Sequence, residues 1–221
     1  MFRVALGLVG YYQFIRGYPL GPELKECLDS MTWRYPVDIK EMNWGPVAIV
    51  QDFQANKISY NRVVLIAAVQ RGRAFGSVIP RRWTGGKLPV MAVQDRIFEA
   101  VTGIVSVDNL LVIGAHFEIW PDEVIVIEVE LPDDCIGNMV LKDLEIHHQS
   151  GQVTPVCDRP IAPDIQKIVD RIVAYTAIAV DRGVTGMKND LVPLSVNDLN
   201  PLSDICHNRL IEDCHQTLPL N

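Results

Sequence analysis

Cysteine and histidine side chains are the first residues in this sequence whose types and spacing could do chemistry. Two pairs, Cys206-His207 and Cys214-His215, lie eight residues apart. Thiolate and imidazole are the usual ligands of tetrahedral zinc. Within one helix, however, eight residues turn through about 800°, which displaces the second pair by about 80° around the axis. The spacing therefore favours a buried stripe along Cys206, Leu210 and Cys214, although a zinc site shared between two chains stays open.

The other candidate reactive groups point to no recognised catalyst. His147-His148 lies in the polar stretch 144–152, for which we expect a loop or hairpin and a surface histidine pair rather than a metal site. The sequence has no G-x-S-x-G nucleophile elbow and no Gly-rich phosphate loop of the P-loop type. These patterns predict neither a catalytic residue nor a cofactor.

Arginines concentrate in one segment of an otherwise acidic chain. Residues 70–87 contain no acidic residue but five basic ones, which are Arg71, Arg73, Arg81, Arg82 and Lys87. A guanidinium group can bind a carboxylate or phosphate through two parallel hydrogen bonds. The segment therefore predicts either a contact with an acidic partner or a solvated loop followed by an edge strand.

Aromatic residues crowd the turn that follows the first predicted strand. Residues 11–18 contain Tyr11, Tyr12, Phe14, Arg16 and Tyr18. Tyrosine and arginine are enriched at the energetic centres of protein interfaces. The turn could thus contact a partner, or its rings could fill a cleft of the chain itself.

Composition bounds the class of protein. The 221 residues are 48% hydrophobic and carry a net charge of −7, which is typical of a globular protein and argues against general nucleic-acid binding. No apolar stretch is long enough to cross a membrane, and we interpret the apolar start as a buried strand rather than a signal peptide. Five widely spaced cysteines are typical of reduced thiols, so we expect a cytoplasmic protein.

Apolar periodicity predicts strands that alternate with helices. The predicted strands span 2–9, 37–42, 62–69, 76–82 (at an edge) and 123–131. The predicted helices span 22–31, 46–54, 93–101, 108–117 (capped by Asp108) and 164–181. This alternation is typical of a three-layer α/β/α fold with a mostly parallel central sheet. We predict a main domain over 1–185 and a C-terminal extension over 186–221 with one helix at 203–217.

The order and spacing of these elements resembles the [NiFe]-hydrogenase maturation endopeptidases from Phe2 to Asp181. That family trims the C-terminal tail of the hydrogenase large subunit. The matching segments are 6–21 (LGLVGYYQFIRGYPLG), 37–53, 62–78 (RVVLIAAVQRGRAFGSV), 106–134 and 161–173. The resemblance implies the same three-layer fold.

The residues that the resemblance assigns to metal reading are absent. In the family a glutamate, an aspartate and a histidine bind nickel in the substrate, and counting along the matching segments places Tyr18, Ala67 and Gly103 there. Glycine and alanine have no donor atom, and a phenol ionises only near pH 10. We therefore expect this chain to be a divergent member of the family that has no metal ligands.

Three functions follow from this reading. The first is a non-catalytic binding or assembly protein that uses the former substrate cleft to hold a protein partner, either a hydrogenase or another multisubunit complex. Its predicted contact face consists of Tyr11, Tyr12, Arg16, Tyr18, Arg71 and Arg73. The alternatives are an active hydrogenase maturation endopeptidase with an unusual site, and a small-molecule or redox module that uses the C-terminal cysteines.

Overall fold

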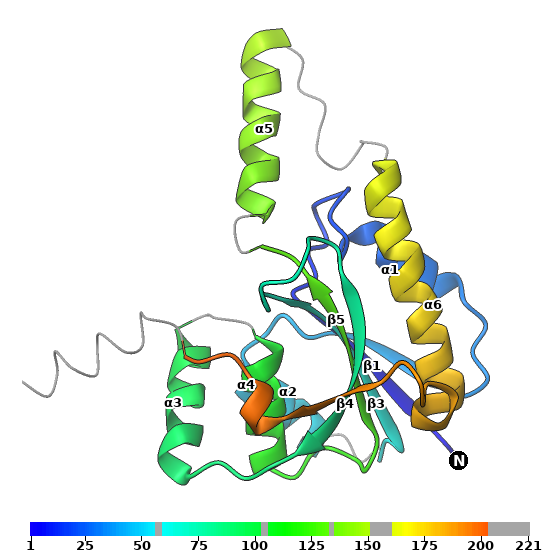
Figure 1. Ribbon diagram of the computed structural model, residues 1–221, viewed down its shortest axis with the longest axis vertical. Helices are drawn as coiled ribbons and strands as arrows, with labels where there is room; N and C mark the ends of the chain where they lie inside the picture. Colours follow the sequence, from blue (N-terminus) through cyan, green and yellow to red (C-terminus); the bar gives the residue numbers. More distant parts are fainter. Residues whose placement is uncertain (56–58, 103–105, 133–134, 151–160, 203–221) are drawn as a thin grey trace, which may run out of the picture.

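A six-stranded sheet lies between two layers of helices in the computed structural model (Figure 1). The structure describes residues 1–55, 59–102, 106–132, 135–150 and 161–202. The strand order is β2-β1-β3-β5-β4-β6. The strands are β1 (Val4–Val9), β2 (Val37–Glu41), β3 (Arg62–Val69), β4 (Val78–Gly85), β5 (Val124–Glu130) and β6 (Val192–Ser195).

The centre of the sheet is parallel and apolar. β1 pairs in parallel with β2 and β3, and β3 pairs in parallel with β5. β4 runs antiparallel to β5 and parallel to β6. Buried parallel strands have continuous apolar sequences because helices cover both of their faces. The predicted fold class, three-layer α/β/α with a mostly parallel sheet, is confirmed.

The helices divide into two layers. They are α1 (Pro22–Ser30), α2 (Pro46–Ala55), α3 (Val90–Val101), α4 (Val107–His116), α5 (Cys135–Ser150) and α6 (Pro163–Gly186). Buried side chains of α1 and α6 pack against one face of β1, β3 and β5. Those of α2 and α4 pack against the opposite face, and α3 packs on α2 and α4. Within the described residues, no helix is long and apolar enough to cross a bilayer.

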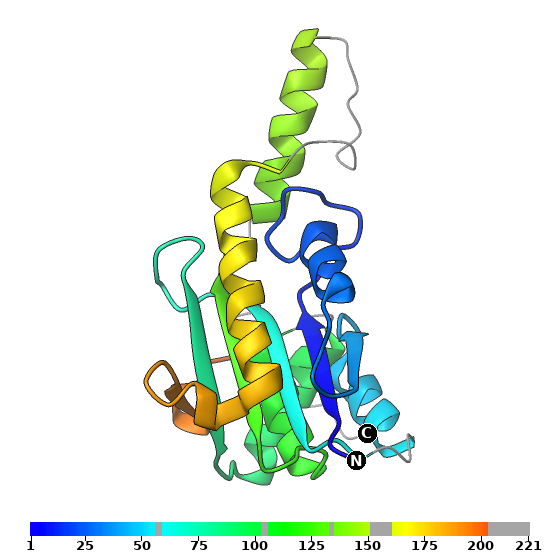
Figure 2. The same ribbon diagram turned by 90° about the vertical axis from the view of Figure 1, so that its right-hand side faces the viewer.

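Helix α5 extends beyond the sheet (Figures 1 and 2). Its backbone includes His147 and His148, so the predicted loop or hairpin at these histidines is wrong. The N-terminal end of α5 meets the body of the protein (Figure 1). Cys135, Ile136 and Met139 from that end pack against the core.

Two further sequence predictions need correction. The strand predicted at 76–82 is not an edge strand, since β4 lies between β5 and β6. β6 comes from the C-terminal extension, so the described part of that extension continues the main sheet. The helix predicted at 203–217 lies outside the described residues.

The residue that caps α4 is Ser106 and not Asp108. The Ser106 side chain accepts a hydrogen bond from the Asn109 amide. Asp108 is thereby available for another contact.

Helix α6 bends at Gly183, which has a φ of +59°. Arg62 fills the bend: its Nε donates to Glu123 Oε2 over 2.7 Å, and its Nη1 donates to the carbonyl of Val180 over 2.5 Å. The amide of Val184 donates to Glu123 Oε1 over 2.6 Å. A side chain at position 183 would meet both Arg62 and Glu123, so only glycine fits the bend.

Gly183→Ala should therefore lower the free energy of unfolding by about 2–4 kcal/mol, because it combines a strained φ with overlap against the Arg62 guanidinium. The measurement is urea denaturation followed by circular dichroism. Gly137→Ala in α5 is the matched control, since no atom lies within 4 Å of an added Cβ there. An equal loss in both variants would contradict the packing argument.

Candidate functional site

A cleft of about 590 Å³ opens at the carboxyl ends of the parallel strands. Its walls include Gly10 after β1, residues 68–71 at the end of β3, and residues 106–108 at the start of α4. The chain leaves β1 toward β2 on one side and returns to β3 on the other, so the strand order reverses between β1 and β3. Open α/β sheets bind ligands at such a switch point. The cleft is therefore the candidate site.

A buried carboxylate lies at the base of this region. Glu128 of β5 is the register partner of Ala67 in β3, and its side chain is fully buried. Paired residues of parallel strands project to the same face of the sheet, so the small Ala67 leaves space beside the Glu128 carboxylate. An isolated carboxylate at such depth would be very costly, and it therefore needs cationic partners.

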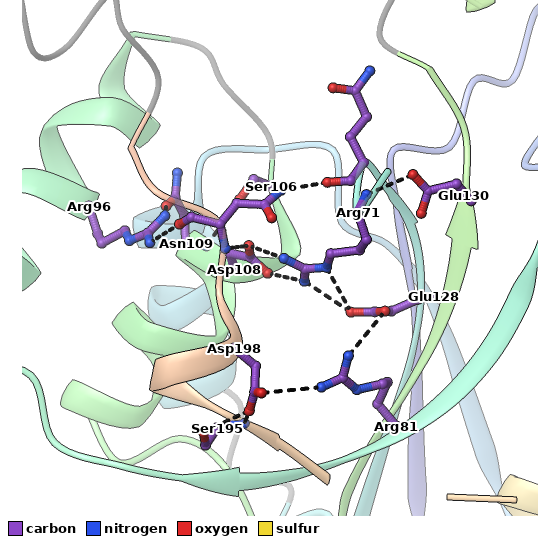
Figure 3. A network of polar contacts seen from close by, with 12 residues as sticks. Arg71, Arg81, Arg96, Ser106, Asp108, Asn109, Glu128, Glu130, Ser195 and Asp198 are labelled. Atoms are coloured by element: carbon purple, nitrogen blue, oxygen red, sulfur yellow. Dashed lines mark hydrogen bonds and ion pairs between the residues drawn. The ribbon is translucent and has the colours of Figure 1, made fainter. Parts of the chain in front are cut away.

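Arg71 is the main partner of Glu128, and it joins three elements (Figure 3). Its Nη1 and Nη2 donate to the two carboxylate oxygens of Asp108 over 2.8 and 2.6 Å. Its Nη2 also donates to Glu128 Oε1 over 2.9 Å. Burial alone would lower the pKa of Arg71, but the hydrogen bonds and charges of Asp108 and Glu128 outweigh burial and raise it. The guanidinium is thus a permanent cation between β5 and α4.

Two more arginines complete the cluster. Arg73 Nη2 donates to Glu128 Oε2 over 2.8 Å, and its Nε donates to Glu130 Oε2 over 2.8 Å. Arg81 of β4 lies 3.8 Å from Glu128 Oε2. Burial would raise the pKa of Glu130, but hydrogen bonds from Arg73 and from the backbone amide of Arg71 lower it. Asp108, Glu128 and Glu130 are therefore all engaged by guanidinium groups.

Arg71 and Arg73 of the basic segment 70–87 thus bind carboxylates of the same chain, which differs from the solvated loop considered in the sequence analysis. Contact of these arginines with an acidic partner stays a prediction. The acidic members, Asp108, Glu128 and Glu130, were missed by the sequence analysis. One signal could have found two of them: Glu128 and Glu130 are spaced by two in an apolar strand, so both face the same buried side.

The predicted contact face does not form one exposed surface. Tyr12 is 48% exposed, whereas Tyr11 and Tyr18 are buried in the core. Tyr12 packs edge-on against Tyr18, with ring centroids 5.7 Å apart, and both line the cleft with Arg71. Arg16 pairs instead with Glu23 and Glu26. The aromatic turn therefore fills the cleft wall with Tyr18 and presents Tyr12, while partner binding by these residues stays a prediction.

The structure describes two of the three residues that stand at the metal-ligand positions of the family. Tyr18 is buried, and burial raises its pKa well above that of a free phenol, so it stays protonated at neutral pH. Ala67 is fully buried in β3. Gly103 lies outside the described residues, as do Cys206-His207 and Cys214-His215. Across the described ranges, no three His, Cys, Asp or Glu side chains gather as a metal site would require.

No protein-family model and no curated protein matches the chain. Among solved structures, an endopeptidase from Escherichia coli is similar with a TM-score of 0.45 and 12% identity over 82% of this chain and 96% of that one. The hydrogenase maturating endopeptidase HybD from E. coli has a TM-score of 0.44 and 13% identity over 80% and 90%. A hydrogenase 2 maturation peptidase from a Thaumarchaeota archaeon has a TM-score of 0.41 and 15% sequence identity, over 80% of this chain and 95% of that one.

Removing the Arg71 guanidinium should be strongly destabilising, because it leaves two buried carboxylates without their main partner. For Arg71→Met we expect a loss of about 3–5 kcal/mol in the free energy of unfolding, measured by urea denaturation. Arg82→Met, which alters an exposed arginine of β4, is the matched control and should change stability by less than about 0.5 kcal/mol. Similar stability of the two variants would refute the structural role of Arg71.

Proposed function

We propose that this chain is a non-catalytic binding or assembly protein, built on a scaffold like that of the hydrogenase maturation peptidases, and that the cleft between β1 and β3 is its binding surface. The observation that carries the proposal is the place of Arg71. Its guanidinium is held by Glu128, the register partner of Ala67, where the sequence resemblance assigns a metal-reading aspartate.

The charges around Arg71 support the proposal that this chain does not bind a metal ion in a substrate. Carboxylates bind a metal ion through lone pairs that are free to coordinate. The carboxylates of Asp108 and Glu128 already accept hydrogen bonds from Arg71, and Glu128 also accepts one from Arg73. An entering metal ion would have to displace these guanidinium groups from the carboxylates. The site is thus suited to polar and aromatic contacts rather than to nickel.

Exposed aromatic side chains surround the same edge of the sheet. Tyr12 and Phe14 follow β1, and Phe75 follows β3; all are substantially exposed. The carboxyl ends of parallel strands meet at one edge, which places both loops beside the cleft. Exposed aromatic groups around a concavity are typical of a surface that binds another protein.

Active peptidase is the second candidate, and a cleavage assay separates it from the first. The full-length chain is incubated with a nickel-loaded hydrogenase large-subunit precursor, and the mass of the precursor is followed by mass spectrometry. We expect the precursor to keep its full mass, because the carboxylates of the Arg71 cluster are already engaged by guanidinium groups and are not free to bind the nickel centre. An active maturation peptidase is the positive control, and nickel-dependent loss of the tail would refute the proposal.

Partner binding is tested by affinity purification of the tagged chain from its own cells, with mass spectrometry of the recovered proteins. Tyr12→Ala should reduce partner recovery by an amount equivalent to about 1–2 kcal/mol, because Tyr12 is the exposed aromatic side chain of the cleft wall. Phe117→Ala is the matched control: Phe117 is 41% exposed but lies at the opposite end of α4 from the cleft. Equal recovery of partner proteins with wild type, Tyr12→Ala and Phe117→Ala would show that the cleft is not part of the interface.

A further inference from the structure

The C-terminal extension returns to the cleft. After β6 and the short 3₁₀ helix η2 (Val196–Asp198), the chain reaches Asn200, Pro201 and Leu202, all of which line the cleft. The approach is anchored, since Leu194 is fully buried and Leu199 packs against the core. Residues 199–202, called the strap here, therefore lie in the space where a bound segment would be expected.

One residue of the strap is bound through its backbone and its side chain. The backbone amide of Asn200 donates to Asp108 Oδ2 over 2.9 Å. Its side-chain Nδ2 donates to the carbonyl oxygen of Gln70 over 2.8 Å. Its own carbonyl accepts a hydrogen bond from Arg96 Nη2. The cleft thus recognises the N–H, the C=O and the amide side chain of a single residue.

The groups that bind Asn200 are themselves held in place. Asp108 is 4% exposed and is fixed by the two hydrogen bonds from Arg71. Arg96 is 9% exposed, and its Nη1 donates to Asn109 Oδ1 over 3.3 Å and lies 3.7 Å from a Glu99 carboxylate oxygen. Figure 3 shows Arg96 and Asp108 on either side of Asn109. Groups fixed before binding lose little entropy when they bind, which is typical of a preformed site.

We propose that the cleft is a peptide-binding site that reads an extended residue with a primary-amide side chain, and that Asn200 is its intramolecular occupant. A partner segment would enter by displacing the strap. This inference rests on the proposed function, because it names the ligand class of the same cleft. A tethered occupant acts at an effective concentration on the order of millimolar. The apparent Kd of a competing ligand is then its intrinsic Kd divided by the fraction of time that the strap leaves the cleft open.

The contacts also define selectivity. The carbonyl of Gln70 can only accept, so the side chain of the bound residue must donate. An aspartate could not donate there, and its charge would be repelled by the carboxylate of Asp108. Pro201 favours an extended backbone at Asn200, whose N–H is bound by Asp108 and whose C=O is bound by Arg96. The predicted ligand is therefore an extended segment of the type Leu-Asn-Pro.

The test uses a labelled peptide with the sequence of residues 198–202 (acetyl-Asp-Leu-Asn-Pro-Leu-amide) and the full-length chain, with fluorescence anisotropy as the readout. Asn200→Ala removes the hydrogen bond to Gln70 and should open the cleft, so we expect it to bind the peptide at least tenfold more tightly than wild type. Asn200→Asp is a second opening variant and should behave alike. Asn197→Ala, an exposed position outside the cleft, is the control and should bind as wild type does.

Two outcomes would overturn the inference. One is equal affinity of wild type and both Asn200 variants, or no binding by any of them. The other is equal affinity for a peptide in which Asp replaces the central Asn, where a loss of at least tenfold is expected. Because this assay needs no partner protein, its failure leaves the partner purification with Tyr12→Ala and Phe117→Ala to judge the proposed function independently.

Discussion

The carboxylate of Glu128 is the constraint on which this end of the molecule depends. It projects from a central strand, it is fully buried, and an unpaired charge there would cost several kcal/mol. Arg71 and Arg73 come from the loop after β3, and Arg81 comes from β4. Pairing with Glu128 therefore fixes the course of that loop over the sheet edge, and the loop in turn forms one wall of the cleft.

The same pairing extends outward to the C-terminal extension. Arg71 binds Glu128 and Asp108 together, which positions the first turn of α4 against β5. Asp108 then has one oxygen directed at the amide of Asn200. A continuous set of charged contacts thus connects the buried strand to a segment more than 70 residues later in the chain. In a low-dielectric interior each such contact depends on the geometry of the next, so the pairing of Glu128 with Arg71 also positions the Asp108 oxygen that binds Asn200.

The sequence was sufficient for the elements that bury long apolar runs. Residues 62–69 were predicted as a buried strand, and β3 has those bounds, because a short apolar run rich in valine and isoleucine is typical of a buried strand. β6 was missed because its four residues bury only Leu194. Asp108 was assigned to a cap because Ser106 and Asp108 are both suitable capping residues, and only the geometry chooses between them.

The candidate site was harder to predict for a different reason. Local patterns report which face of an element is buried, but the partners of Arg71 lie 37 and 57 residues away along the chain. A run of arginines without acids therefore resembled a cationic surface, although the neutralising carboxylates come from α4 and β5. The aromatic turn shows the same limitation: Tyr12 and Tyr18 are six residues apart and in contact, yet one is half exposed and the other buried.

Charge balance within the cleft bears on how it would select a ligand. Arg71, Arg73 and Arg96 are each paired with carboxylates of the same chain, so little net charge remains to attract an ionic ligand. The overall charge of −7 therefore says little about this surface. Long-range electrostatic attraction of a ligand to the cleft is therefore weak. Discrimination between ligands would have to come from directional hydrogen bonds to backbone groups and to one amide side chain, like those of Asn200. A buried polar group left unpaired by a poorly matched ligand is costly, and this cost supplies selectivity without a metal ion or a charged anchor.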